Sequence, residues 1–442
     1  MENIYSFFRT ALPRTGNFFK NPSVLLYLLA SILISIPLKT IFISLTLIAF
    51  VVTSFFFFKK ANFNLTYILI LPLLLYVIML LSVFWTEDQG ATLSGLQKEL
   101  PFLFIPLVFS FIPKLNKIDA YKVFRLYSFS MIICALYYLF RATFKYFQTK
   151  NSSVFFYHEL VTIELNAIYV SIFVSFALFY FISLTKKSIW DKVSLFILSL
   201  FIFLLSSKSV ITIDFIMIIC YYSFFAPIPK GIKSLTIIAV FGFVIFSLFF
   251  VKEVKDRFLL EYETAFVDNT INTSLGNKNE KVYNISLKQA WVNKEFQANN
   301  FFPGTALRVY QFRIFNELIK EKKVFFTGFG LEASQNQIRD KAIQHKLYPG
   351  YGEFNFHNQY IQTFSELGVF GFLVLILMLI RNIKNAWISK DFLHIVFAVS
   401  MIILFLSESF FCRQRGIVFF IIFYCIFNLI PQDDNKFKPI TK

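Results

Sequence analysis

Charged side chains are scarce in this 442-residue sequence. Only 16% of the residues are Asp, Glu, Lys or Arg, whereas a soluble domain contains about 25%. Hydrophobic residues make up 57% of the chain, 63 residues are Phe, and the mean hydropathy is +0.63. This composition excludes an ordinary soluble domain and indicates an integral membrane protein.

Acidic residues are fewer than basic ones, 26 against 43, which leaves a formal net charge of +17. Such an excess occurs in nucleic-acid-binding proteins, but these carry their basic residues on one face of a folded domain. Here Lys and Arg form short clusters between apolar runs, as in the connections of membrane proteins. Nucleic acid is therefore excluded as a partner, and membrane lipid is expected.

Cysteine is also rare, with four in the chain. Cys134, Cys220 and Cys425 lie inside apolar runs, and Cys412 lies at the end of one. The CxxC spacing typical of zinc sites does not occur, so neither a disulfide framework nor a cysteine metal site is expected.

Long apolar runs dominate the chain, and twelve of them can cross about 30 Å of hydrocarbon as helices. An even number of spans places both termini on the same side. The expected spans lie near residues 22–38, 41–58, 65–85, 100–113, 122–140, 166–184, 190–206, 209–226, 233–251, 359–380, 391–409 and 416–430.

Basic residues in the short connections predict the orientation. With the N-terminus inside, the inner segments carry nineteen Lys and Arg residues and the outer segments carry eight, at positions 39, 98, 141, 145, 150, 208, 413 and 415. Because basic residues favour the cytoplasmic side, both termini are expected in the cytoplasm. The chain then divides into nine spans (1–251), a large, mainly helical outer loop (252–358), and three spans with a cytoplasmic tail (359–442). The middle of the loop, residues 267–286, reads as a mobile segment.

Only four histidines occur, and one stands at the entrance to a membrane span, in "FNFHNQYIQTFSELGVFGFL" (354–373). His357 could be a polar cap on the helix end or a group that takes part in chemistry. Glu366, two turns into the same span, must be paired or protonated there. Of the other three, His345 and His394 are expected to be incidental, whereas His158 is either a plain interfacial side chain or a contact for a substrate.

Two arginines lie on opposite faces of a predicted helix within residues 305–323. Arg308 shares a stripe with Phe312 and Phe315, so it is either a snorkelling side chain or a clamp for an anion. Arg313 lies on the polar face, where it is expected to be a solvated charge that pairs with Glu317 four residues later.

Four stretches together resemble the O-antigen ligase and polymerase family. These are "RVYQFRIFNELIKEKKVFFTGFG" (308–330), "HNQYIQTFSELGVFGFL" (357–373), "LLSSKSVITIDF" (204–215) and "SESFFCRQRGIVFF" (407–420). The chain departs from the family at Lys208, where an arginine is usual, and so keeps the charge but loses the planar fork. Arg413 matches the arginine that members of the family carry near the end of a late outer loop.

The resemblance implies an all-helical membrane enzyme of the bacterial inner membrane, with its active site on the periplasmic side. It would transfer a glycan from undecaprenyl diphosphate to a sugar hydroxyl of lipid A-core or a related glycolipid, with inversion and without a metal or other cofactor. Two alternatives are a polymerase that uses the same donor with a growing glycan as acceptor, and a polysaccharide transporter or flippase.

The resemblance also implies roles for individual residues. His357 is expected to be the catalytic base, with Arg308 beside it, because the acceptor hydroxyl must lose a proton. The departing diphosphate needs positive charge, for which Arg308, Arg413 and Lys208 are expected. The expected supporting residues are Asn358, Glu366 and Glu408. Of these, Glu408 is expected beside Arg413, either to orient that arginine or as part of a surface ion pair.

Overall fold

A computed structural model of the chain describes residues 21, 23–58, 63–162, 164–250, 255, 261–272, 275 and 281–431. Several basic residues used to predict the orientation lie outside these ranges, namely Arg9, Arg14, Lys20, Lys59, Lys60, Lys436, Lys438 and Lys442, as does the predicted cytoplasmic tail from residue 432 on. Which end faces the cytoplasm stays a prediction of the charge distribution.

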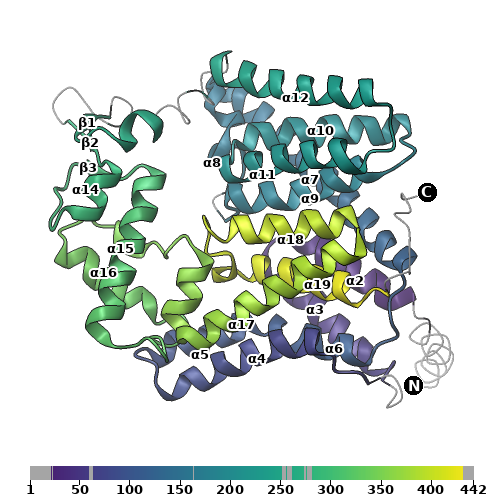
Figure 1. Cartoon of the computed structure of the whole chain (residues 1–442), viewed down its shortest axis with the longest axis horizontal. Helices are drawn as coiled ribbons and strands as arrows, with labels where there is room; N and C mark the ends of the chain where they lie inside the picture. Colours follow the sequence, from purple (N-terminus) through teal and green to yellow (C-terminus); the bar gives the residue numbers. More distant parts are fainter. Residues whose placement is uncertain are drawn as a thin grey trace, which may run out of the picture.

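Each of the twelve apolar runs coincides with a helix. The helices are α2 (Ser23–Ser35), α3 (Thr40–Phe55), α4 (Tyr67–Leu81), α6 (Pro101–Phe111), α7 (Lys117–Thr149), α9 (Ala167–Ser183), α10 (Ile189–Leu205), α11 (Lys208–Cys220), α12 (Lys230–Phe250), α17 (Gln359–Ser389), α18 (Phe392–Leu404) and α19 (Gln414–Leu429). In Figure 1 they run roughly side by side and form one helical body.

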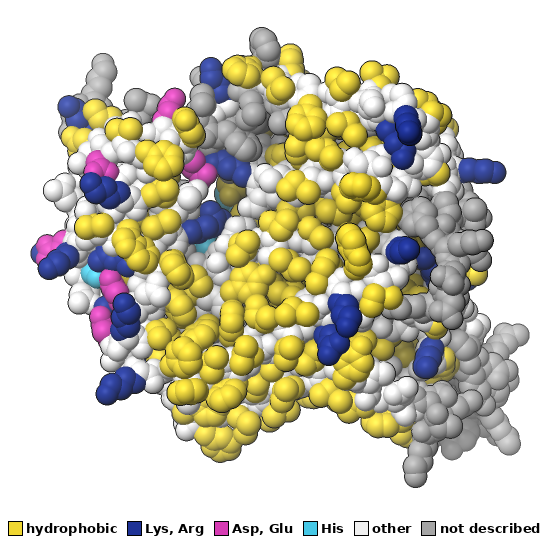
Figure 2. Space-filling view, in the orientation of Figure 1, with side chains coloured by type: hydrophobic (Ala, Val, Ile, Leu, Met, Phe, Trp, Pro, Cys, Tyr) yellow, Lys and Arg dark blue, Asp and Glu magenta, His cyan; other side chains and the backbone are white. Residues whose placement is uncertain are grey.

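In the part of the chain that the structure describes, four helical segments are long and apolar enough to cross a membrane: Tyr67–Phe84, Lys117–Thr149, Lys208–Phe225 and Gln359–Ser389. Several other apolar helices are shorter, such as α9 and α19. The chain is therefore all-helical with several membrane spans, and the number twelve stays a prediction. The helical body carries a broad hydrophobic surface on the face that Figure 2 shows, as expected of side chains in contact with lipid.

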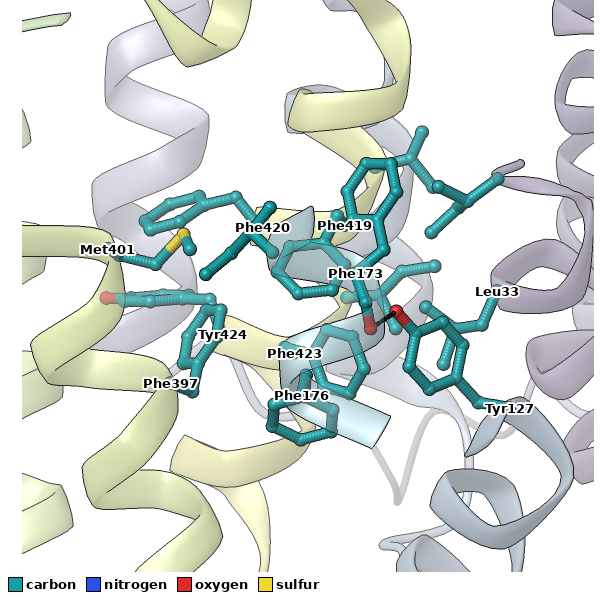
Figure 3. Close-up of a cluster of buried hydrophobic side chains, with 14 of the residues drawn as sticks. Leu33, Tyr127, Phe173, Phe176, Phe397, Met401, Phe419, Phe420, Phe423 and Tyr424 are labelled. Atoms are coloured by element: carbon teal, nitrogen blue, oxygen red, sulfur yellow. Dashed lines mark hydrogen bonds between the residues drawn. The ribbon is translucent and has the colours of Figure 1, made fainter. Parts of the chain in front are cut away.

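A seam of aromatic rings holds the helical body together around α19 (Figure 3). The ring of Phe423 lies 4.3 Å from that of Phe176 in α9, and Phe419 lies 5.0 Å from Phe173. The hydroxyl of Tyr127 in α7 donates a hydrogen bond to the carbonyl oxygen of Phe173. Helix α19 is buried over most of its length. Its packing therefore holds the turn that precedes it in place.

A second group of elements lies at one end of the body, at the left of Figure 1, and is called the outer subdomain after the side predicted for it from the sequence. It has its own hydrophobic cluster, built around Phe302, Tyr310, Phe329 and Phe356. Its main helices are α14 (Leu287–Val292), α15 (Gly304–Lys322) and α16 (Ser334–Gln344). Between the body and this subdomain lie further helices, such as α5 (Gln89–Glu99) and α8 (Tyr157–Leu160).

Part of the segment expected to be a mobile loop is regular structure. Strand β1 (Thr270–Ile271) pairs antiparallel with β2 (Tyr283–Asn284), which pairs parallel with β3 (Asn300–Phe301). The side-chain amide of Asn272 donates to Asn284 Oδ1 at 2.9 Å. The expectation was wrong for these residues because β1 pairs with β2 within the segment and β2 pairs with β3 outside it, which the local composition does not reveal.

Helix α17 is broken at Gly368, which has φ 64° and ψ −166°. The backbone of the Gly328–Gly330 turn packs directly on this break. Phe329 N donates to Ser365 O, Gly330 N donates to Glu366 O, and Val369 N donates to Phe325 O. These bonds fasten the outer subdomain to α17, so the first part of α17 (359–367) is positioned by the subdomain.

Replacing Gly368 by Ala should destabilise the protein strongly. A Cβ at this position would lie 2.1 Å from Phe326 O, and the backbone conformation is one that residues other than glycine avoid; such strain costs about 1–3 kcal/mol. Thermal unfolding in detergent would measure the loss. Gly242→Ala in α12 is the matched control, because nothing lies within 4 Å of the added Cβ, and equal melting temperatures of the two variants would contradict the role of the break.

Arg313 is buried rather than solvated, which corrects the expectation for its surroundings. Its pairing with Glu317 is confirmed, with 2.8 Å between Arg313 Nε and Glu317 Oε1, and its Nη1 also donates to the carbonyl oxygen of Asn293 at 2.6 Å. His345 is buried beside this pair, with Nδ1 3.0 Å from the Tyr310 hydroxyl and Nε2 3.5 Å from Glu317. Both residues therefore belong to the interior of the outer subdomain.

Mild acid should loosen the outer subdomain through His345. Burial lowers the pKa of His345 below its ordinary value of 6.5, although Glu317 opposes this shift. The unfolded chain then binds more protons below pH 6.5, so stability is lost as the pH falls from there, by at most about 1.4 kcal/mol per pH unit for one group. Thermal unfolding between pH 7.5 and 5.5 should reveal this loss.

The variant His345→Gln should flatten that dependence, because its side chain cannot titrate. The carboxyl of Glu317 titrates only at lower pH: burial raises its pKa, but the hydrogen bond from Arg313 holds the pKa below 4.5 overall. An unchanged slope in the variant would show that another group is responsible.

Candidate active site

The outer subdomain meets the helical body at a charged boundary. Figure 2 shows Lys and Arg side chains, with acidic side chains and histidine, between the apolar body and α14–α16. Four residues predicted from the sequence lie here and are called the boundary cluster: Lys208, Arg308, His357 and Glu408.

Lys208 is placed by a tight turn between two helices. Helix α10 ends at Ser206, whose left-handed conformation (φ 48°) reverses the chain, and α11 begins at Lys208. The Lys208 ammonium lies 3.0 Å from Glu261 Oε2. The next residue, Ser209, places its hydroxyl 3.0 Å from that of Ser407.

Arg308 lies in the second turn of α15 and reaches across to the connection between α18 and α19. Its Nε and Nη2 both donate to the carbonyl oxygen of Ser407, at 3.1 and 3.0 Å, and Nη1 donates to Gly304 O at 3.2 Å. Nη2 also lies 3.6 Å from Glu408 Oε1. The guanidinium is thus held in one orientation by backbone carbonyls, which a snorkelling side chain would not be.

Glu408 joins Arg308 to His357. Its side chain is only 5% exposed, and its second oxygen, Oε2, lies 3.8 Å from His357 Nδ1. The His357 side chain is 23% exposed, while its Nδ1 is buried and has no hydrogen-bond partner among the described residues. A charge pair at the rim of a low-dielectric body interacts more strongly than one in water.

His357 does not cap the helix that it precedes, because Asn358 does. Asn358 Oδ1 accepts a hydrogen bond from Ile361 N at 3.1 Å, and its side-chain amide donates to Leu406 O. His357 itself has φ 46°, a conformation uncommon outside glycine, and its N–H donates to Asn355 Oδ1. The strained backbone turns the imidazole toward Glu408.

Two of the predicted site residues, Glu366 and Arg413, lie outside the boundary cluster. Glu366 accepts a hydrogen bond from Gln362 Nε2 at 2.5 Å and lines a small cavity together with Glu99 and Glu332. Arg413 is exposed at the N-terminus of α19 and forms no ion pair with a described residue. The neighbouring Arg415 is buried and donates to the carbonyl oxygens of Glu164 and Leu38.

Several residues of the boundary were not singled out from the sequence. Ser407 and Ser409 bind Arg308 and Asn358, since Ser409 Oγ accepts from Asn358 N at 3.1 Å. Glu261 pairs with Lys208. The only signal for the serines is the polar triplet Ser407–Ser409 between two apolar runs, and for Glu261 no local signal exists because its partner is more than fifty residues away.

This fold and site define a multi-pass membrane protein with a polar, charged site where its helices meet an outer subdomain. None of the curated proteins compared with the chain matches it. The model of the O-antigen ligase family matches residues 160–376, and through this region the chain belongs to that family. The matched region contains Lys208, Arg308 and His357 but ends before Glu408.

Family membership makes the chain a membrane enzyme of the ligase and polymerase type, with lipid-linked glycan and acceptor substrates in general terms. The remaining three histidines lie away from the boundary cluster: His158 is exposed beside Tyr157, His345 is inside the outer subdomain, and His394 is buried against Asn382 Oδ1 at 3.0 Å.

Replacing Glu408 by Gln should lower kcat for glycan transfer roughly 10- to 100-fold, the usual effect of losing a residue that orients a site. The melting temperature should change little, because the amide keeps the shape of the side chain. The measurement is transfer by the purified protein in proteoliposomes. Glu353→Gln is the matched control, since Glu353 is exposed and pairs only with exposed Arg339; equal kcat values in the two variants would contradict the role of Glu408.

Proposed function

We propose that the protein transfers a glycan from undecaprenyl diphosphate to a sugar hydroxyl, on lipid A-core or a related glycolipid, at the outer face of the inner membrane. The observation that carries the proposal is that one buried carboxylate, Glu408, lies between the guanidinium of Arg308 and the imidazole of His357. A cationic group and a proton acceptor thus meet beside an apolar body that a lipid-borne donor can approach.

The proposed reaction is a single displacement at the anomeric carbon. The acceptor oxygen forms a bond to that carbon, the bond from the carbon to the diphosphate oxygen breaks, and the diphosphate leaves with the electron pair. The proton of the acceptor hydroxyl passes to the imidazole of His357. Arg308 and Lys208 offset the negative charge on the departing diphosphate, a role that a metal ion has in other enzymes.

Arg308 is suited to a diphosphate because the guanidinium has five N–H donors in a fixed plane. Three of its nitrogens already bind carbonyl oxygens of Ser407 and Gly304, which orients the plane, and N–H groups remain for an anion. Lys208 adds a compact charge without this geometry. Arg413, exposed and five residues beyond Glu408, remains in the proposal as a third cation for the donor.

The polymerase is the main alternative, since it differs only in the acceptor. A transporter is less well supported, although a broken helix such as α17 is also a feature of transporters. In α17 the backbone around the break forms hydrogen bonds with residues 325–330 of the outer subdomain. The ionisable groups lie beside that subdomain, which favours an enzyme.

Replacing His357 by Ala should lower glycan transfer about 10²- to 10⁴-fold, the usual contribution of a general base. The variant should still insert into the membrane and melt close to the wild-type temperature, because Asn358 keeps the helix cap. Transfer from a purified undecaprenyl-diphosphate glycan in proteoliposomes measures the rate.

His158→Ala serves as the matched control, because His158 is exposed in the short helix α8. Normal transfer by His357→Ala would overturn the proposed chemistry. Offering lipid A-core and lipid-linked single repeats in the same assay identifies the acceptor: a ligase extends lipid A-core, whereas a polymerase lengthens the glycan on its carrier.

A further inference from the structure

A carboxylate that the proposed reaction does not use pairs with one cation of the boundary cluster, Lys208. Glu261 Oε2 is 3.0 Å from Lys208 Nζ. Its Oε1 faces the first turn of α15, since a Cβ built on Gly304 would lie 2.8 Å from Glu261 Oε1 and 3.3 Å from Arg308 Nη1. The lack of a side chain at Gly304 is therefore what allows the carboxylate to approach α15.

Glu261 differs from Glu408 in its surroundings. Glu408 is 5% exposed and lies beneath Arg308 and His357, whereas Glu261 and Lys208 are each about one quarter exposed. An exposed pair of this kind contributes little to stability. The helical residues 261–265, which begin with Glu261, belong to neither α11 nor α15, so the carboxylate can move away from Lys208 without disturbing these two helices.

We propose that the Glu261 carboxylate is a built-in competitor for the diphosphate of the donor, so that it sets the affinity of the site and its preference for a highly charged anion. This inference rests on the proposed function. A diphosphate that binds the Lys208 ammonium takes the place of the Glu261 carboxylate. A lipid diphosphate carries more charge than a monophosphate and replaces the carboxylate more readily.

If Glu261 competes with the donor, its removal should strengthen the binding of diphosphate. Removal of a catalytic or structural residue should instead weaken binding or activity. Without the carboxylate the positive charge of Lys208 is less offset in the empty protein, so an incoming anion gains more from it. The Glu261→Gln variant should therefore bind diphosphate more tightly, by about two- to fivefold given the usual strength of such pairs. Its preference for diphosphate over monophosphate should shrink, and its kcat should not fall.

The test uses the full chain in lipid nanodiscs with farnesyl diphosphate and farnesyl monophosphate as probes. Binding of each probe is measured by microscale thermophoresis for the wild type, Glu261→Gln and Glu263→Gln, the last an exposed neighbour that serves as control. Glu261→Asp, whose shorter side chain reaches less far toward Lys208, provides a second variant if Glu261→Gln does not fold. Arg308→Ala tests the anion site itself.

Tighter binding of diphosphate by Glu261→Gln, with Glu263→Gln at the wild-type value, supports the inference. Equal or weaker binding by Glu261→Gln, while Arg308→Ala loses binding, overturns the competitor and leaves the proposed function standing. A collapse of kcat in Glu261→Gln also overturns it and assigns Glu261 to the chemistry. Absence of binding by every protein overturns both proposals.

Discussion

The site depends on one short connection, Ser407–Ser409, between α18 and α19. Its three residues bind groups from three other elements. Ser407 accepts hydrogen bonds from Arg308 of α15 and contacts Ser209 of α11. Glu408 lies between Arg308 and His357, and Ser409 accepts a hydrogen bond from the backbone N–H of Asn358 at the start of α17. The connection itself has little freedom, because α19 is fixed by its buried aromatic seam and Tyr169 of α9 donates to the carbonyl oxygen of Ser409. The apolar core thus holds the polar site in place.

The location of this connection explains how charged groups persist beside so apolar a body. A charge transferred into hydrocarbon without partners is very costly, and in the boundary cluster each of the four side chains lies within 3.8 Å of a group that can carry the opposite charge. Glu408 is the deepest member, and the charges that face it, Arg308 and His357, come from the outer subdomain and from the segment that follows it. The site therefore forms only when the subdomain is seated on the body.

The sequence allowed the helices to be predicted well and their contacts poorly. Every apolar run became a helix, because length and hydropathy are local properties. The break in α17 was missed, since Gly368 becomes non-helical only through its contact with residues 325–330. Arg313 was placed in solvent for the same reason: its burial depends on Asn293 and α14, which the helical stripe around Arg313 does not include.

For the candidate site, motif order identified Arg308, His357, Lys208 and Glu408, and the structure brings these four to one boundary. The spacing of the motifs did not predict which of these charged groups pair with one another. Glu408 was expected beside Arg413, but its contacts are with Arg308 and His357, and the buried arginine of that motif is Arg415. Charge type is visible in a sequence, whereas the partner of a charge is set by chain segments far apart.

Two closely packed glycines, Gly328 and Gly368, connect the position of the outer subdomain to the geometry of the site. Gly328 and Gly368 approach each other so closely that either Cβ would overlap the other segment's backbone, 2.4 Å from Glu366 O in one case and 2.1 Å from Phe326 O in the other. The outer subdomain is therefore joined to α17 by backbone hydrogen bonds, which fix distance and register more closely than side-chain packing does. Because His357 lies at one end of this short α17 segment and Gly368 at the other, a shift of the subdomain would move the imidazole relative to Glu408. Gly328 and Gly368 thus lie away from the reacting groups. Their close packing nevertheless determines whether His357 and Glu408 come together.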